Sequence, residues 1–468
     1  MKKITLFWPP SHRIYELRFK SPPLGISTIA QILQKNNFNV TSIDSHQFFS
    51  VKEFENMSDE MILKRLLSFV EKTEPDILGI GSWTYSMPFV AEFIKEFKIK
   101  NPDTILVLGG YNSTFLPNET LQLLPQTDFL VRGEGHNTML ELVKVLNNGK
   151  NVNRIKGISF IKNGKIVHTQ DRPMEENLDN LPLLDFSSFT VLKKIKIFYL
   201  MSSISCPYRC NFCSVNAFWK IFRTHSVDYI IKQIKLLQRI FGDVDISFMD
   251  DNFTCRKEWV RKFSDELKNN NINIKWSCFS RADFVERELF NKMKQSGLES
   301  VFLGIESITS KTLKFFNKAG DVGVYKKTVE KSLSILKELK LAASLSFIIG
   351  SPDETREDML RNIEFMESVS KNYDKIELQL SKLVLEINST LWNRYIKGEI
   401  GITKIKNGRL IAEYAGRQLF IKMYDDKVWM VPQAYMLNNS NMNSEELERT
   451  LLELCERFDN IKKFILPK

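Results

Sequence analysis

Three cysteines lie within eight residues of this chain, in the run Cys206-Pro-Tyr-Arg-Cys210-Asn-Phe-Cys213. The thiolate form of cysteine binds metals. Three thiolates on one tight loop suit a [4Fe–4S] cluster in which one iron has no protein ligand. Because an open iron can bind a small molecule, the run predicts a site where chemistry takes place.

Two other interpretations of these cysteines stay open. A structural zinc site normally has four ligands, and His225 is the nearest candidate for a fourth. A disulfide is less favoured, because six cysteines in 468 residues and no signal peptide indicate a reducing compartment, and we expect a cytoplasmic protein. Cys255, Cys278 and Cys455 are scattered, and we interpret them as small hydrophobic residues without a role.

The charge and hydropathy of the chain exclude some partners. The net charge is +10, but the basic residues are spread along the chain and no stacking-aromatic motif accompanies them, so we do not expect nucleic-acid binding. An anionic substrate or an acidic peptide fits this charge. No apolar run reaches the ~18–20 residues that a membrane span needs, so we expect no membrane partner.

Short apolar strands and amphipathic helices alternate over residues 1–150. The strands are expected at Lys3–Trp8, Asn39–Ile43, Asp76–Gly81, Thr104–Leu108 and Asp128–Val131. This alternation predicts an open, Rossmann-like parallel sheet with helices on both faces. Ligands of such sheets bind outside the carboxyl ends of the strands. Glycines recur at those ends, where they let the backbone approach a large flat ligand.

The rest of the chain divides into a connector, a second region of alternating strands and helices that ends at about residue 378, and a C-terminal cap. Residues 151–190 are expected to be a connector with a hairpin at Asn163-Gly164. Residues 191–378 repeat strand–helix units, with strands at Ile197–Met201, Asp245–Met249, Lys275–Cys278, Ser300–Gly304 and Ser344–Ile349. Residues 379–468 are expected to form a small α+β cap, with helices at Leu391–Ile396 and Ser444–Phe458 and strands at 410–414, 419–423 and 427–431.

The cysteine run, with Phe212 before its last cysteine, resembles the signature of the radical S-adenosylmethionine (SAM) superfamily. The segments Pro22–Gly25, Gly109–Thr114 and Arg132–His136 together resemble the cobalamin-binding domain that precedes the radical domain in one large subfamily. The resemblance covers about residues 1–380. It implies a partial (β/α)6 barrel after the first domain and three cofactors, namely a [4Fe–4S] cluster, SAM and cobalamin.

The resemblance also implies residues for each cofactor. Cys206, Cys210 and Cys213 would hold the cluster, and Asp250 or Asp251 would hold the SAM ammonium through a charge-assisted contact. The other SAM contacts would be Ser280, Arg281 and Glu306, with Ile348, Gly350 and Phe212 lying against the adenine. Ser346 replaces the first glycine of the family's Gly-x-Ile-x-Gly pattern.

The cobalamin contacts that the resemblance implies are mostly backbone and small side chains. They are Leu24, Ser82, Trp83, Thr84, Gly109, Gly110, Tyr111, Gly133, Glu134 and Gly135. Many cobalamin proteins supply an axial histidine from an Asp-x-His-x-x-Gly loop. The run Asp44-Ser45-His46 echoes that loop, but it lacks the glycine and follows the second strand. We therefore expect cobalt without a histidine ligand.

The implied activity is methylation of an unactivated carbon through methylcobalamin and a 5′-deoxyadenosyl radical. Two alternatives stay open, which are a rearrangement, cyclisation or oxidation with the same cofactors, and a non-catalytic cofactor-binding or sensor protein. The expected partners are a small-molecule or peptide substrate and an electron donor such as flavodoxin or ferredoxin. No residue is assigned to a catalytic proton transfer, and nothing in the cap identifies the substrate.

Overall fold

The computed structural model of the chain describes residues 2–10, 21–149, 151–190, 192, 195–319, 322–407, 423, 426–430 and 432–461. The chain divides into two units, which are described separately below. The first comprises Met1–Tyr199, Arg239–Phe241 and Ala415–Val431. The second comprises Leu200–Gln238, Gly242–Tyr414 and Pro432–Lys468.

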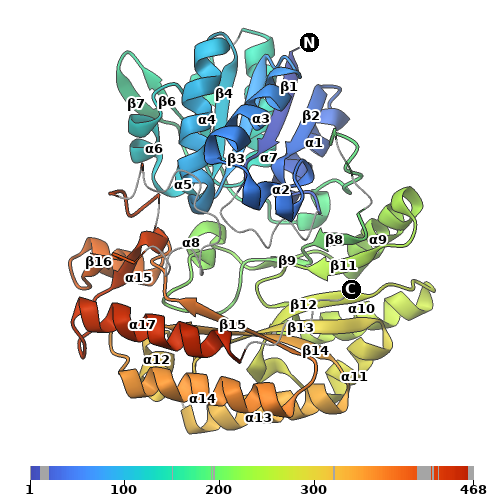
Figure 1. Cartoon of the computed structure of the whole chain (residues 1–468). Helices are drawn as coiled ribbons and strands as arrows, with labels where there is room; N and C mark the ends of the chain where they lie inside the picture. The colour runs from blue at the N-terminus through green and yellow to red at the C-terminus, as the bar shows by residue number, and fades with distance from the viewer. Residues whose placement is uncertain are drawn as a thin grey trace. The chain divides into compact units, whose positions relative to one another are not determined.

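A seven-stranded sheet with the order β2-β1-β3-β4-β5-β6-β7 organises the first unit (Figure 1). Its first five strands run parallel and are β1 (Lys3–Trp8), β2 (Asn39–Asp44), β3 (Ile77–Ser82), β4 (Ile105–Gly110) and β5 (Phe129–Val131). Helices cover both faces of a sheet of this kind, so its central strands are apolar on both sides, as in the fully buried Ile77, Leu78 and Ile80. The predicted open α/β domain is confirmed.

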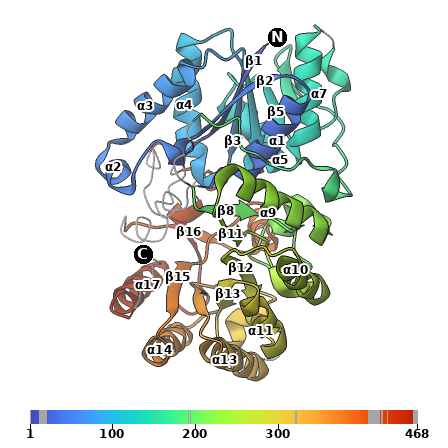
Figure 2. The same ribbon diagram turned by 90° about the vertical axis from the view of Figure 1, so that its right-hand side faces the viewer.

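Helices lie on both faces of this sheet (Figure 2). On one face α1 (Leu24–Lys35) packs against α7 (Gly135–Asn147), and on the other α3 (Asp59–Glu71) packs against α4 (Met87–Lys100). Ile26, Ala30 and Leu33 form the buried stripe of α1, as their helical spacing predicts. Three shorter helices complete the unit, namely α2 (Val51–Asn56), α5 (Tyr111–Phe115) and α6 (Pro117–Leu123).

The predicted hairpin forms at Asn163-Gly164, where both residues have positive φ angles of 50° and 73°. Its strands are β6 (Ile158–Lys162) and β7 (Lys165–His168). β6 also pairs antiparallel with β5. The connector therefore extends the sheet of the first unit, because β5 would otherwise leave its backbone groups unpaired at the sheet edge.

A six-stranded sheet with the order β15-β14-β13-β12-β11-β8 organises the second unit (Figure 1). Its strands are β8 (Ile197–Leu200), β11 (Asp245–Phe248), β12 (Trp276–Arg281), β13 (Leu298–Glu306), β14 (Ala342–Ile349) and β15 (Ile376–Lys382). The strands keep their chain order and run parallel, with helical crossovers between them. This arrangement is the predicted partial barrel, whose functional residues belong at the carboxyl ends of the strands.

The crossover helices of the second unit are α9 (Val227–Phe241), α10 (Lys257–Asn269), α11 (Arg287–Gln295), α12 (Ser310–Phe315), α13 (Val322–Glu338) and α14 (Arg356–Asn372). The short helix α8 (Val215–Trp219) lies between β9 (Ser203–Ile204) and β10 (Arg223–Thr224), which pair antiparallel. The cysteine run is therefore placed between the two strands of a small ribbon.

The C-terminal part contains α15 (Thr390–Ile396), β16 (Ile402–Lys404), β17 (Tyr435–Leu437) and α17 (Ser444–Asp459). Both predicted helices are confirmed. The predicted strand at 427–431 is wrong, because the Met430 N–H donates to the Lys427 carbonyl and closes a turn. Strand pairing occurs instead between β16 and β17. The predicted strands at 410–414 and 419–423 lie outside the described residues, apart from Met423.

Candidate functional site

The cysteine loop, residues 206–213, begins after β9 and ends before α8. Its three cysteines are partly buried and form no disulfide. Ser205, which precedes the loop, has a φ of 77°. A non-glycine residue in this region costs of order 1–3 kcal/mol and persists only where surrounding contacts hold it. The turn into the loop is therefore held by its environment.

Further along the loop, the backbone is held by a clasp segment, Phe315–Asn317, at the end of α12. The Asn211 N–H donates to the Phe316 carbonyl at 2.9 Å, and Asn211 Nδ2 donates to the Phe315 carbonyl at 2.6 Å. Asn317 Nδ2 donates to the Arg209 carbonyl at 2.9 Å. Phe212, which we predicted to cover adenine, lies edge-on to Phe316 with 4.9 Å between ring centres. The clasp thus fixes the backbone on both sides of Cys210.

The three thiols have raised pKa values, chiefly because burial disfavours the thiolate, and the pKa of Cys213 rises to about 12. A metal must therefore displace these protons when it binds. Among the described residues, no three His, Cys, Asp or Glu side chains lie close enough to hold a single metal ion. His225, the proposed fourth zinc ligand, stacks on Tyr229 with 4.0 Å between ring centres. This arrangement does not support the zinc interpretation.

The two predicted acids after β11 have different surroundings. Asp250 is fully buried and accepts hydrogen bonds from the Ser202 N–H at 2.9 Å, Ser202 Oγ at 2.6 Å and Ser203 Oγ at 2.5 Å. Arg256 Nη2 lies 3.4 Å from the same carboxylate. Asp250 therefore fixes the strand that leads into the cysteine loop. Both of its carboxylate oxygens already accept hydrogen bonds from protein groups.

The carboxylate of Asp251, unlike that of Asp250, can still accept hydrogen bonds from a ligand. Its side chain is exposed. Surrounding protein and the adjacent Asp250 raise the pKa of its carboxyl to about 7. Its charge also raises the pKa of Cys206 and Cys213, which places it near the cysteine loop. Of the two predicted residues, only Asp251 has a carboxylate with free acceptor capacity beside the cysteines.

Ser280 and Arg281 lie at the carboxyl end of β12, as predicted. The Ser280 and Thr254 hydroxyls share a hydrogen bond. Arg281 forms a two-pronged pair with Asp283, with distances of 2.9 and 2.8 Å, and donates to the Lys318 carbonyl at 2.8 Å. Its guanidinium lies 4.2 Å from the centre of the Tyr208 ring, a cation–π contact with the cysteine loop.

Glu306, at the end of β13, is paired with a residue that sequence reasoning missed. Lys318 Nζ lies 2.9 Å from Glu306 Oε1, and both side chains are more than nine-tenths buried. Glu306 has a φ of 64°, which marks a strained position of the kind that clusters at functional sites. No sequence pattern relates the two residues, because their contact depends on how the chain after β13 folds back.

Ile348 and Gly350 lie at and just after the end of β14. Gly350 has a φ of 91°, and its N–H donates to Glu354 Oε2 at 2.7 Å. Glu354 is fully buried, which raises the pKa of its carboxyl to about 7. The Ser351 N–H also donates to Glu354 at 3.2 Å. Glu354 therefore shapes the backbone turn that we predicted to lie against adenine.

The predicted cobalamin contacts meet at the carboxyl ends of β3, β4 and β5 in the first unit. Ser82 pairs in register with Gly110, and Ser82 Oγ donates to the Gly109 carbonyl at 3.0 Å. The Gly133 N–H donates to Thr114 Oγ1 at 2.9 Å, which joins the loops after β4 and β5. The chain thus gathers Ser82, Trp83, Thr84, Gly109, Gly110, Tyr111, Gly133, Glu134 and Gly135 at one edge of the sheet, with Leu24 at the start of α1.

Glycines shape the backbone at this edge and leave space beside it. A Cβ at Gly110, whose φ is 114°, would collide with the Ser82 carbonyl oxygen, so only glycine fits there. A Cβ at Gly133 or Gly25 would meet nothing within 4 Å, so the backbone faces open space. Asn112 Oδ1 and Ser113 Oγ are buried and lack hydrogen-bond partners among the described residues. Sequence reasoning missed these two polar groups.

His46, which lies in a run similar to the cobalt-ligand loop, is not at the ends of β3, β4 and β5. His46 is on a 3-10 turn (Ser45–Gln47) after the edge strand β2. Its Nδ1 is 3.2 Å from Asp44 Oδ1, and both side chains are buried. β1 and β3 separate β2 from β4 in the sheet.

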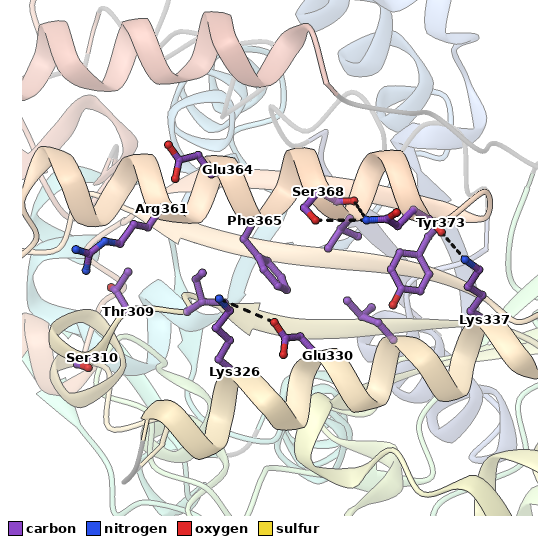
Figure 3. Close-up of a pocket in the computed structure, with 14 residues that line it drawn as sticks. Thr309, Ser310, Lys326, Glu330, Lys337, Arg361, Glu364, Phe365, Ser368 and Tyr373 are labelled. Carbon is purple, nitrogen blue, oxygen red and sulfur yellow. Dashed lines mark hydrogen bonds and ion pairs between the residues drawn. The ribbon is translucent and has the colours of Figure 1, made fainter.

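A groove on the outer side of the barrel, between α13 and α14, lies away from these residues (Figure 3). Lysine, arginine and glutamate side chains line it together with Phe365 and Tyr373, and Lys326 pairs with Glu330 at 3.9 Å. None of the predicted cofactor residues lines this groove.

Comparison with known proteins identifies both units. Residues 13–143 match the B12 binding domain and residues 202–366 match the radical SAM superfamily. An uncharacterized methyltransferase of Pyrococcus horikoshii is 30% identical over 378 residues, with 79% of each chain covered. This chain belongs to the cobalamin-binding radical SAM superfamily. Its cofactors are a [4Fe–4S] cluster, SAM and cobalamin.

Other members of the cobalamin-binding radical SAM superfamily differ in their named activity. An anaerobic magnesium-protoporphyrin IX monomethyl ester cyclase of Synechocystis is 26% identical, covering 73% of this chain and 67% of that protein. The radical SAM methyltransferase TsrM of Kitasatospora setae, solved with cobalamin and a [4Fe–4S] cluster, has the same fold. Its TM-score is 0.72 at 14% identity, covering 99% of this chain and 89% of that one. Among the described residues, no helix has the length and apolar character that a bilayer crossing requires.

Proposed function

We propose that this radical SAM enzyme methylates an unactivated carbon of its substrate. The observation that carries the proposal is the 30% identity to a protein named as a methyltransferase. That alignment covers 79% of the chain and so includes parts of both the B12-binding and the radical SAM domain. Methyl transfer is a reaction that would use both cofactors in one cycle.

In this proposal Cys206, Cys210 and Cys213 would hold the cluster, with one iron left without a protein ligand and open to SAM. When bound, the cluster supplies the electron that cleaves SAM and the cobalamin supplies a carrier for the methyl group. The clasp segment fixes the backbone on both sides of Cys210 before metal arrives. Pre-organisation of this kind lowers the entropic cost of binding.

We propose Asp251 as the partner of the SAM ammonium and Asp250 as a residue that positions the loop. A carboxylate with free acceptor capacity can form a charge-assisted hydrogen bond, whereas the oxygens of Asp250 are already used. Arg281, Ser280 and the Glu306–Lys318 pair would contact the carboxylate and ribose of SAM. Phe212, Ile348 and Gly350 remain the proposed adenine contacts.

The edge formed by the ends of β3, β4 and β5 is the proposed cobalamin site. Backbone groups at Gly109, Gly110 and Gly133 would approach the ligand, and the small side chains of Ser82 and Thr84 would leave it room. His46 is held by Asp44 at the edge strand, so we propose that it does not ligate cobalt. We also propose 1–150, 151–190, 191–378 and 379–468 as the cobalamin domain, connector, barrel and cap.

A second candidate function is a radical rearrangement, cyclisation or oxidation without methyl transfer. It is favoured by the 26% identity to a cyclase, which spans 73% of this chain. The two candidates use the same cofactor-binding residues and differ only in the fate of the substrate radical.

Product analysis tests the proposal. The enzyme, loaded with cluster and cobalamin, is given a strong reductant, SAM with a deuterated methyl group and a small-molecule extract. Methylation predicts S-adenosylhomocysteine together with 5′-deoxyadenosine, and a deuterated methyl group in one extract component. Deoxyadenosine without S-adenosylhomocysteine would contradict methylation and support the second candidate. Formation of neither product would contradict both candidates and leave a protein that only binds the cofactors.

A further inference from the structure

Exposed basic residues lie on the cysteine loop and on the helix whose end contacts it. Arg209 lies between Cys206 and Cys210 and is exposed. Its carbonyl accepts the hydrogen bond from Asn317, which follows α12. Lys311 and Lys314 on α12 are exposed as well. The loop and the end of this helix are therefore in contact, and each carries exposed positive charge.

The helix α15 adds to the same surface. The Leu391 N–H donates to the Asn211 carbonyl at 3.0 Å, so the first turn of α15 contacts the cysteine loop. The Arg394 guanidinium lies 5.6 Å from the centre of the Phe315 ring, which places α15 next to α12. One turn further on, Ile396 is 63% exposed and Lys397 is exposed. We call Arg209, Lys311, Lys314, Arg394 and Lys397 the basic rim.

The charge of the basic rim is mostly uncompensated. Elsewhere on the second unit, some exposed cations pair with carboxylates, as Lys275 does with Glu299 and Arg356 with Glu453. Within the described part of the chain, Arg394 is the one rim residue that forms an ion pair, with Glu399 at 3.2 Å. Four of the five cations are thus free to interact with another molecule.

We propose that the basic rim docks an acidic one-electron carrier protein that reduces the cluster. This inference rests on the proposed assignment of the cluster to the three cysteines. Electron transfer weakens steeply with distance, and Arg209 belongs to the cysteine loop itself. One electron leaves the reduced carrier and takes the cluster from its 2+ to its 1+ state, and no atom is transferred.

The composition of the rim suits a transient electron-transfer contact. Such interfaces are small, typically below ~1,200 Å², and complementary charge raises the association rate more than the affinity. Electrostatic steering of this kind raises on-rates by roughly 10- to 1,000-fold and weakens with salt. The exposed Ile396 supplies an apolar contact among the cations.

The test compares two triple charge reversals. K311E/K314E/K397E reverses three rim lysines that form no ion pair in the described structure. K262E/K331E/K371E is the matched control, since it changes three exposed lysines on α10, α13 and α14 by the same net charge. Cluster reduction is followed by rapid-mixing absorbance with reduced flavodoxin as the probe, and separately with dithionite.

We expect the rim variant to be reduced at least 10-fold more slowly than wild type by flavodoxin at low salt, with the difference shrinking at high salt. Reduction by dithionite should stay within twofold, and the control variant should behave like wild type with both reductants. Equal flavodoxin rates for the rim and control variants would overturn the docking site. A wild-type protein with no cluster that dithionite can reduce would instead overturn the proposed function, and the docking proposal with it.

Discussion

At the residue scale, two neighbouring aspartates have different surroundings and different proposed roles. Asp250 and Asp251 are consecutive, yet one is buried among hydrogen-bond donors and the other is exposed beside the thiols. Consecutive residues leaving a strand point to opposite sides. The sequence could predict that an acid follows this strand. It could not predict which of the two carboxylates is free to bind a ligand, because that depends on which one Ser202, Ser203 and Arg256 contact in the fold.

The first prediction separates the two acids. Asp251→Asn should weaken SAM binding by about 10- to 150-fold, since a hydrogen bond to a charged group contributes roughly 1.5–3 kcal/mol. Thermal stability should change little, because the Asp251 side chain is exposed. Isothermal titration with SAM and a melting curve measure both effects.

Asp250→Asn should behave in the opposite way. It removes the charge that compensates Arg256 and disturbs the bonds to Ser202 and Ser203, and breaking a buried pair typically costs about 3–5 kcal/mol. We expect a lower melting temperature and poor cluster loading. If Asp250→Asn leaves stability intact and Asp251→Asn leaves SAM affinity intact, the roles given to the two acids are wrong.

The second prediction concerns the cluster ligands. Replacing Cys206, Cys210 and Cys213 together by Ala should abolish iron binding, the cluster absorbance and deoxyadenosine formation. Cys255→Ala is the matched control, because the Cys255 thiol lies near enough to Cys206 for their charges to interact but is given no role. Its cluster content should equal that of wild type. A triple variant that keeps a full cluster would refute the assignment.

At the element scale, the strands and most helices follow from local patterns, whereas the contacts between elements do not. Alternating strand and helix periods predict both parallel sheets, since they depend on nearby residues. The clasp of Phe315–Asn317 on the cysteine loop joins positions about 100 residues apart, and only the packed structure shows it. The same holds for Lys318, whose role follows from its pairing with Glu306.

The third prediction concerns Lys382, at the end of β15. Lys382 is buried, and Nζ donates to the Tyr435 carbonyl at 2.6 Å, which joins β15 to β17. Burial lowers the pKa of this lysine to about 7. The folded state therefore binds fewer protons than the unfolded state between pH 7 and about 10.5, so this lysine makes the protein more stable as pH rises through that window.

Lys382→Met removes this proton linkage. Between pH 7 and pH 9, the free energy of unfolding of wild type should rise relative to that of the variant by up to about 1.4 kcal/mol per pH unit. The melting temperature of wild type should rise relative to the variant over the same range. Calorimetric scans of both proteins at several pH values measure the difference, and groups common to both proteins cancel. Lys371→Met, which replaces an exposed lysine, is the control, and its stability should depend on pH as that of wild type does. Parallel profiles for Lys382→Met would show that Lys382 is charged in the folded state.

At the scale of the whole molecule, two sheets of one chain each present loops at the carboxyl ends of their strands. One set of loops carries the glycines that we propose as cobalamin contacts, and the other carries the thiols, Asp251 and Arg281. The order of the domains could be predicted from the motifs, because each motif is local. The substrate could not, because the C-terminal part carries no pattern tied to a ligand.

The central claim is that this chain binds a corrinoid in addition to the cluster, and the most direct test is the paramagnetic resonance spectrum of the reduced protein. The protein is prepared anaerobically with hydroxocobalamin, freed of unbound ligand and reduced to Co(II). We predict a signal equivalent to about one cobalt per chain, without nitrogen superhyperfine splitting, because we expect the bound cobalamin to be base-off and its cobalt to lack a histidine ligand. Nitrogen splitting would contradict the ligation, and the absence of a retained corrinoid would contradict the account itself, and the methyltransferase proposal with it.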